Sequence, residues 1–288
     1  MKYITKSILK KIFRPRDKWS HKRDFGHLLI IGGSHVYTGP PIFNALAAYR
    51  TGVDLVSIIS PKRAADIAAS YAPELITYPV EGKFFNKRHV KTVLEIIEEI
   101  KPDVCVIGGG ITKNNNVSKF IVKILENIYI PCVIDADALY ILSKNVSLIK
   151  ENYILTPHSK EFYYLTGLLP PKNLHERVNL VKQKSLELGC TILLKGYLDI
   201  ISNGNEVLIN KTGTPAMTVG GTGDVLAGIA GALVSMKNDA FISAVTAAFI
   251  SGKAGEYAFK KYGFSLLPSD VINEIPKVIK SLIKAKNR

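Results

Sequence analysis

The chain has few of the features that mark secreted, membrane-spanning or disulfide-rich proteins. It contains three cysteines in 288 residues, Cys105, Cys132 and Cys190, and none of them forms a C-x-x-C pair. Each lies in or beside an apolar run, so we expect buried thiols in a reducing compartment and a cytoplasmic location. No uninterrupted apolar core occurs in residues 1–23, so no signal peptide is predicted. The longest apolar region, residues 225–250, is interrupted at residues 237–239, so no membrane span is predicted.

Acidic residues are almost absent from the two ends of the chain. Residues 1–23 carry nine Lys or Arg against the single acid Asp17, and residues 275–288 carry five with no acid. These segments therefore supply +13 of the net charge of +14 and leave the body nearly neutral. A nucleic-acid groove needs its charge on the body, so no nucleic-acid partner is predicted. We expect a solvated basic extension over residues 1–23, followed by a single domain over residues 24–288.

Apolar runs alternate with segments of helical periodicity along the chain. The predicted strands are residues 27–31, 53–59, 74–80, 103–107, 131–135, 153–157, 191–195, 199–202 and 206–210. The predicted helices are residues 37–51, 62–71, 87–100, 117–127, 174–188, 224–236 and 240–262, with further helices from about 159 and 269. This alternation predicts an α/β fold with a mostly parallel central sheet and helices on both faces. Asn203-Gly204 between two short apolar runs predicts a terminal antiparallel hairpin.

A glycine-rich loop comes directly before the apolar helix predicted at residues 224–236. It reads Gly220-Gly221-Thr222-Gly223-Asp224, with neither a following Lys-Ser/Thr pair nor the G-x-G-x-x-G spacing, so it is not a P-loop or a dinucleotide fingerprint. Free N–H groups at such a helix start favour an anion, so Gly221, Thr222 and Gly223 are the predicted anion hole. We expect the helix dipole to hold Asp224 ionised as a proton acceptor. The alternative is a simple helix cap with Asp224 as the N-cap.

Three other polar or glycine-rich segments follow predicted strands. They are Gly32-Gly33-Ser34, Gly108-Gly109-Gly110 and Asp135-Ala136-Asp137, and a fourth is the Thr156 to Glu161 segment. Ligands of parallel sheets bind at the carboxyl ends of the strands, so four such segments on one edge predict a cleft. Each alone is also typical of an ordinary turn, and Asp137 is expected to be the N-cap of its helix.

Together these segments resemble the ribokinase-like superfamily and, within it, the NAD(P)H-hydrate dehydratases. The resemblance covers about residues 26–228 and is carried by Gly32-Gly33-Ser34 with Tyr37-Thr38-Gly39, by Asp135-Ala-Asp137-Ala-Leu139, by Leu155-Thr-Pro-His158-Ser-Lys-Glu161, by Leu194-Lys195-Gly196, and by Asn210 to Met217 leading into the glycine loop. It implies a ribokinase-like fold and a repair reaction. In that reaction ADP phosphorylates the C6 hydroxyl of the S-form of hydrated NADH or NADPH, and departure of phosphate restores the cofactor with release of AMP.

The resemblance also implies roles for individual residues. Asp224 is the implied catalytic residue and contacts the hydrate together with Gly110 and His158. The segment implied to hold the adenylate comprises Lys195, Gly196, Tyr197, Leu198 and Asp199, together with Gly223. Glu161 is implied to orient Mg²⁺ through water, and ADP is the implied co-substrate. For His158, we expect a neutral imidazole either to position the ring or to accept its C5 proton.

The chain departs from the family pattern after its first loop. Gly39 is followed by Pro40 where relatives usually have alanine, so contact between the hydrate and Pro40 is an expectation. Relatives often carry a fused epimerase domain, whereas only 23 residues precede the body here, so a separate epimerase protein is expected. We also expect a homo-oligomer.

Two other functions remain open at this stage. One is a ribokinase-like kinase that phosphorylates a vitamin-precursor alcohol and keeps the phosphate on its product. The other is a non-catalytic nucleotide-binding module that docks on RNA through its basic ends. His158 favours the dehydratase over the kinase, and the presence of Asp224 and Glu161 opposes the non-catalytic module. The preferences between ADP and ATP, and between the two hydrates, are left open.

Overall fold

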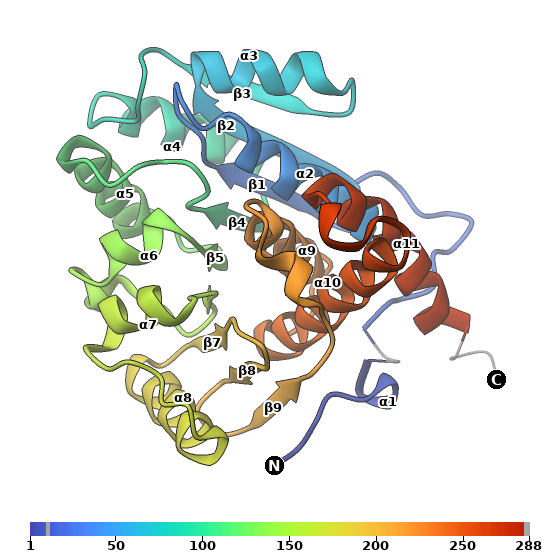
Figure 1. Cartoon of the computed structure of the whole chain (residues 1–288). Coiled ribbons are helices and arrows are strands. Elements are labelled where there is room, and N and C mark those ends of the chain that lie inside the picture. The colour runs from blue at the N-terminus through green and yellow to red at the C-terminus, as the bar shows by residue number, and fades with distance from the viewer. Residues whose placement is uncertain (10–11, 285–288) are drawn as a thin grey trace.

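The computed structural model describes residues 1–9 and 12–284 and is built around one nine-stranded sheet (Figure 1). The strand order is β3 (Ile76–Val80), β2 (Leu55–Pro61), β1 (His27–Ile31), β4 (Val104–Ile107), β5 (Cys132–Ile134), β6 (Ile154–Leu155), β7 (Thr191–Leu194), β8 (Asp199–Ser202) and β9 (Val207–Asn210). All neighbours from β3 to β7 are parallel, whereas β7–β8 and β8–β9 are antiparallel. Gly204, with φ +87°, lies in the turn between β8 and β9. The predicted parallel sheet and terminal hairpin are confirmed.

Helices cover both faces of the sheet, as predicted (Figure 1). One face is covered by α2 (Gly39–Thr51), α9 (Thr222–Ser235), α10 (Ala240–Tyr262) and α11 (Pro268–Lys284). The other is covered by α4 (His89–Ile100), α5 (Asn115–Asn127), α6 (Asp137–Leu142), α7 (Ser159–Thr166) and α8 (Leu174–Leu188). Helix α3 (Lys62–Tyr71) packs against β2 and β3.

The continuous apolar strands fit this arrangement because their alternate side chains enter two different cores. In β1, Leu28 and Ile30 belong to the core beneath α2, α9 and α10, whereas Leu29 and Ile31 belong to the core beneath α4 to α8. All four side chains are fully buried. A strand buried on both faces has no polar side to alternate with, which is why its sequence is uniformly apolar.

The N-terminal segment is not simply solvated, contrary to the expectation from its charge. Tyr3 pairs in parallel with Ile209 at the free edge of β9, and the backbone N–H of Ile4 donates to the Ile209 carbonyl at 2.9 Å. Ile4, Leu9 and Ile12 are buried in the core on the α10 side of the sheet. A short helix, α1 (Lys6–Leu9), lies in this segment and has no counterpart in the sequence prediction. The positive charges of the segment therefore lie on a chain whose apolar side chains help to build the core.

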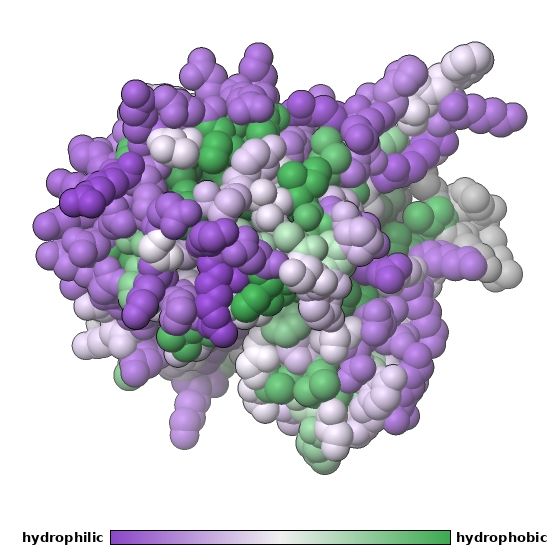
Figure 2. Space-filling model, turned by 90° about the horizontal axis from the view of Figure 1, so that it is seen from above, coloured by the Kyte–Doolittle hydropathy of each residue, from purple (hydrophilic) through white to green (hydrophobic). Residues whose placement is uncertain are grey.

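Hydrophilic residues dominate the face of the molecule seen in Figure 2, where hydrophobic residues form small separate groups. None of the helices in the described part of the chain combines the length and apolar character that a bilayer crossing requires. All three cysteines are buried and free, as predicted.

Candidate active site

The start of α9 lies at the carboxyl edge of the parallel strands. Its N-cap is Gly221, with φ +105°, and no side chain caps this end of the helix. The first N–H groups of a helix have no partner within the helix. Among the described residues, no hydrogen bond from outside the helix satisfies the N–H groups of Thr222, Gly223 or Asp224. The start of α9 therefore presents unpaired donors to the strand edge.

Asp224 is the third residue of α9, and neighbouring elements fix its place. The Asn44 side chain in α2 donates to the backbone carbonyl of Asp224 at 2.6 Å. Gly228, one turn further along α9, has no side chain to separate the two helices where it meets the backbone of Asn44. The Asp224 carboxylate lies against Gly109, where any side chain would collide with it. The helix cap alternative is wrong for Asp224, because its carboxylate faces the strand edge.

Burial, rather than the helix dipole, has the larger effect on the charge of Asp224. Burial raises the pKa of Asp224 to about 7, and the nearby Asp135 carboxylate raises it further, while Lys195 lowers it. The expectation that the helix start keeps this group ionised is therefore wrong. A carboxyl with a pKa near 7 can accept a proton at neutral pH and hold it well enough to act as a general base.

A partly buried lysine joins two further carboxylates at the same edge. The Lys195 ammonium, after β7, lies 2.7 Å from Asp135 Oδ1 and 3.9 Å from Glu161 Oε2. The same Asp135 oxygen accepts a hydrogen bond from Thr156 Oγ1 at 2.7 Å. Burial acts to lower the pKa of Lys195, but Asp135 and Glu161 outweigh it, so the pKa is raised and the side chain stays charged. Burial also raises the pKa of Glu161.

Gly223 brings the start of α9 against this ion pair. A Cβ atom at Gly223 would lie 3.4 Å from Lys195 Nζ and 3.7 Å from Asp135 Oδ2. The free N–H groups, the ammonium and the Asp224 carboxylate therefore converge at one place. Such an arrangement can hold an anion beside a proton acceptor.

The predicted hydrate contacts Pro40 and Gly110 lie on the other side of Asp224. A Cβ at Gly109 would lie 2.8 Å from Pro40, and Gly109 is the glycine that contacts the Asp224 carboxylate. Gly110 has φ +74°, and a Cβ there would lie 2.8 Å from the Tyr37 side chain. The β1, β4 and α9 segments are thus brought together as the sequence predicted.

His158 is the N-cap of α7 and is engaged through both ring nitrogens. Its Nδ1 accepts from the backbone N–H groups of Lys160 and Glu161 at 3.1 and 3.3 Å. Its Nε2 lies 3.3 Å from Glu161 Oε1, and Glu161 Oε2 accepts from the His158 backbone at 2.8 Å. Nδ1 therefore faces the backbone donors of α7, and Nε2 faces the Glu161 carboxylate. Both ring nitrogens have partners in this structure, which favours the positioning role over acceptance of the C5 proton.

Several predicted nucleotide residues lie outside this cluster. Tyr197 is 93% exposed, and Asp199 holds the β7–β8 turn by accepting from the Gly196 N–H at 3.0 Å and from Asn210 at 2.9 Å. Burial raises the pKa of Asp199 to about 6. Leu198 is half-buried in the same turn. These residues form a projecting turn next to Lys195.

Two members of the predicted anion hole have structural contacts. The Thr222 hydroxyl donates to the Met217 carbonyl at 2.7 Å, so only its backbone N–H faces a ligand. A Cβ on Gly221 would meet Phe43 and Pro268, both at 2.8 Å. Glycine is needed at this position because α9 must start against those two side chains.

The sequence prediction gave neither aspartate after β5 a role in the site. Asp137 is the first residue of α6 rather than its N-cap, which is Ala136 with φ +51°. Its carboxylate lies 3.4 Å from Lys113 Nζ at the surface. Asp135, which received no role, is the buried partner of Lys195. Its place directly after a buried strand was the available signal.

Metal binding by protein side chains alone is not supported. Among the described residues, no group of three His, Cys, Asp or Glu side chains converges to hold an ion. Mg²⁺, however, usually keeps several waters and binds one or two carboxylates together with substrate phosphates. Glu161 and Asp135 at this edge fit such a partial site, in which Mg²⁺ would be held mainly by a nucleotide.

Comparison with known proteins agrees with this geometry. The family model described as NAD(P)H-hydrate dehydratase matches residues 28–277. The chain belongs to the NAD(P)H-hydrate dehydratase family. The match includes β1 to β9 and the whole cluster around Asp224.

Two curated relatives show how the family is organised. The chain is 38% identical over 284 residues to the ADP-dependent (S)-NAD(P)H-hydrate dehydratase of Nitrosopumilus maritimus, covering 98% of each chain. It is 44% identical over 270 residues to the bifunctional NAD(P)H-hydrate repair enzyme Nnr of Methanocaldococcus jannaschii, covering 94% of this chain and 51% of that protein. The chain thus spans about half the length of the bifunctional relatives.

Solved structures confirm the ribokinase-like fold. A ribokinase-like superfamily protein of Enterococcus faecalis superimposes with a TM-score of 0.83 at 23% identity, covering 98% of this chain and 96% of that one. The ADP/ATP-dependent NAD(P)H-hydrate dehydratase of Bacillus subtilis, co-crystallised with ATP and Mg²⁺, gives a TM-score of 0.82 at 23% identity, covering 98% of each chain. At this identity the two structures establish the fold alone.

Proposed function

We propose that the protein is an ADP-dependent dehydratase that restores NADH or NADPH from the S-form of the cofactor hydrated at C6. The observation that carries the proposal is the position of the Asp224 carboxylate. It lies between the unpaired N–H groups of α9 and the Gly109 turn, in a family that is described by this activity. A phosphoryl donor on one side and an alcohol on the other are the two ligands that such a site can bring together.

The first step is transfer of the β-phosphoryl group of ADP to the C6 hydroxyl. Asp224 removes the hydroxyl proton as the oxygen attacks phosphorus, and the bond to the leaving AMP oxygen breaks. The N–H groups of Thr222 and Gly223 and the Lys195 ammonium stabilise the negative charge on the transferred group. The turn formed by Gly196, Tyr197, Leu198 and Asp199 lies beside Lys195 and holds the adenylate.

The second step removes the phosphate that the first step attached. The electron pair of the ring nitrogen forms a bond to C6 as the C6–O bond breaks, and transfer of a proton from C5 to the departing phosphate then restores the double bond. His158 keeps the ring in place, together with Pro40 and Gly110. Hydroxide is a poor leaving group and phosphate is a good one, which is why ADP is consumed.

Mg²⁺ fits the proposal as an ion held by the nucleotide phosphates, with Glu161 contacting its waters. When bound, it neutralises phosphate charge near Lys195. Use of ADP rather than ATP, a homo-oligomer and a separate epimerase partner stay predictions.

Incubation with hydrated NADH, Mg²⁺ and ADP or ATP tests the proposal directly. We expect AMP (from ADP), phosphate and reduced nicotinamide to appear in equal amounts.

Asp224→Asn should bind ADP but lower turnover by ~10²–10⁴, the usual effect of losing a positioned base. Asp239→Asn is the matched control, because Asp239 caps α10 and asparagine caps equally well. An Asp224→Asn rate above about a third of wild type would contradict the assignment. A stable phosphorylated product from a vitamin-precursor alcohol would instead indicate a kinase.

A further inference from the structure

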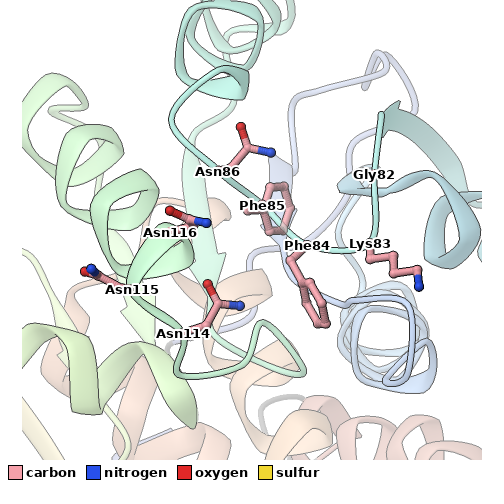
Figure 3. A pocket seen from close by; sticks show the side chains of 8 residues that line it. All are labelled: Gly82, Lys83, Phe84, Phe85, Asn86, Asn114, Asn115 and Asn116. Atoms are coloured by element: carbon pink, nitrogen blue, oxygen red, sulfur yellow. The ribbon is translucent and has the colours of Figure 1, made fainter.

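A hollow of about 450 Å³ lies beyond the Asp224 cluster, on the side away from Lys195. It is formed by the loop after β3, from Gly82 to Asn86, and by Asn114 to Asn116 at the start of α5 (Figure 3). Its volume lies within the usual range for small-molecule pockets. None of the residues assigned to the reaction lines it.

The hollow is connected to the predicted hydrate contacts by short segments. The chain passes from Gly110 to Asn114 within one loop. On the other wall, the backbone N–H of His35 donates to the Lys83 carbonyl at 2.9 Å, which ties the loop after β1 to the loop after β3. A ligand with one end at Gly110 can therefore continue into the hollow.

The direction of the two substrates follows from the order of the strands. Lys195 follows β7, Asp135 follows β5, Gly109 follows β4, and the hollow involves the loop after β3. In phosphoryl transfer the attacking and leaving oxygens lie roughly in line. ADP and its acceptor must then extend in opposite directions from the phosphorus atom. With the adenylate at the β7 end, the rest of the acceptor points toward β3.

The chemistry of the hollow suits a nucleoside rather than an apolar group. Phe85 is fully buried and stacked on Phe120, with ring centroids 4.6 Å apart, so the floor is rigid. Phe84 is only partly buried and offers a ring, and Asn116 offers an amide with no hydrogen-bond partner among the described residues. Aromatic rings stack on bases, and asparagine amides pair with the edge of adenine.

Positive charge is available where the phosphates of a dinucleotide would pass. Lys83 is exposed and forms no ion pair with any described residue. It also lines a second hollow of about 490 Å³, where Lys62 pairs with Asp66 at 3.1 Å and Arg63 and Glu81 are further neighbours. A pyrophosphate group between the ring and the nucleoside would pass close to the Lys83 ammonium.

We infer that the hollow between Gly82–Asn86 and Asn114–Asn116 is a binding subsite for the adenosine half of the dinucleotide substrate. The inference rests on the proposed function, because it uses the hydrated ring as the fixed end of the ligand. The hollow then contributes affinity and selects a dinucleotide over a mononucleotide without touching the reacting atoms.

The test compares hydrated NADH with hydrated reduced nicotinamide mononucleotide, which has the same ring and no adenosine. In the wild type, KM for the mononucleotide should exceed KM for the dinucleotide by about tenfold or more, since one stacked base contributes on that scale. Asn116→Trp fills the hollow from an exposed position. It should raise KM for hydrated NADH about tenfold, leave kcat near the wild-type value and change neither constant for the mononucleotide by more than about twofold.

Asn205→Trp provides the matched control, because Asn205 is exposed in the β8–β9 turn at the opposite edge of the sheet. It should change neither KM nor kcat for either substrate. Equal wild-type KM values for the two substrates, or an equal effect of Asn116→Trp on both, overturns the subsite while leaving the dehydratase proposal intact. A wild type that dehydrates neither substrate overturns the proposed function and the subsite with it.

Discussion

At the scale of single residues, the charge of Asp224 depends on two neighbours with opposite effects. Asp135 raises its pKa and Lys195 lowers it, while burial has the largest effect and brings it to about 7. The proton acceptor must be ionised to work. We therefore expect kcat/KM to rise with pH up to about 7 and then level off.

Asp135→Asn should move that profile to lower pH. The substitution removes a negative charge that raises the Asp224 pKa and leaves Lys195 with one fewer carboxylate beside it. Both changes favour the ionised form of Asp224, so the midpoint of the rise should fall. Rates measured across pH 5 to 9 (roughly two units either side of the midpoint) on the residual activity test this. Asp137→Asn, on a carboxylate that pairs with Lys113 at the surface, should leave the midpoint unchanged. A midpoint that stays at about 7 in both variants would contradict the assignment of this titration to Asp224.

The chemical types in the site could be predicted from the sequence, but their pairings could not. Glycines followed by an aspartate at a helix start indicated an anion and a base, and both lie at the strand edge. The pairing of Lys195 with Asp135 joins residues that are sixty positions apart, and no local pattern encodes it. The raised pKa of Asp224 depends on burial by other elements and was predicted in the wrong direction.

At the scale of elements, His158 has a structural role at the start of α7 in addition to its proposed role in positioning the ring. His158 and Glu161 form a reciprocal cap in which each side chain accepts from the other residue's backbone. His158→Ala should lower the free energy of unfolding by about 1 kcal/mol, the usual cost of losing an N-cap. His158→Asn should restore that stability, since asparagine is a strong N-cap.

Comparison of these two variants separates capping from ring positioning. Stability is measured by urea unfolding, and activity by KM for hydrated NADH at saturating ADP. If His158 positions the ring, His158→Asn keeps the stability and still shows a raised KM. Full recovery of KM in His158→Asn would mean that the residue acts only through the helix.

Most elements could be predicted because their signals are local. Proline in the first turn and glycine after the last residue set the bounds of α2. The predictions were less accurate where burial decides the boundary. The strand predicted at residues 53–59 is β2 at Leu55–Pro61, because Gly52 and Val53 complete the cap of α2 before pairing begins.

At the scale of the whole molecule, the first residues pair through one isolated β-bridge with the edge strand β9. Removal of residues 1–12 would expose β9 and leave cavities where Ile4, Leu9 and Ile12 are buried. We expect a loss of about 3 kcal/mol or more in unfolding free energy, since each buried aliphatic side chain contributes about 1.5–3 kcal/mol. Calorimetry should show this as a melting temperature lower by roughly 5 °C or more.

Charge is the alternative explanation for any effect of that deletion. Lys18→Gln with Lys22→Gln removes two exposed positive charges and no buried side chain. This double variant should melt at nearly the wild-type temperature. Equal stability of the deleted and full-length proteins would show that the buried side chains contribute little.

The charge pattern of this segment led to the wrong prediction that it is only a solvated extension. Its apolar residues Leu9, Ile12 and Phe13 lie at helical spacing after Ile4, but the lysines and arginines among them dominate the composition, and the prediction followed the charge. The partner strand β9 lies near the other end of the sequence, and only the assembled sheet shows that its edge needs a cover.

The contact between Tyr3 and Ile209 also has a consequence for the order of folding. The two residues are separated by roughly two hundred positions, and loops of that length close slowly. During synthesis the first residues leave the ribosome long before their partner strand exists. The edge of the sheet can be sealed only after the β8–β9 hairpin has emerged. Asp224 follows that hairpin closely in the sequence, so the final strand pairing and the completion of the active site belong to the same late stage of synthesis.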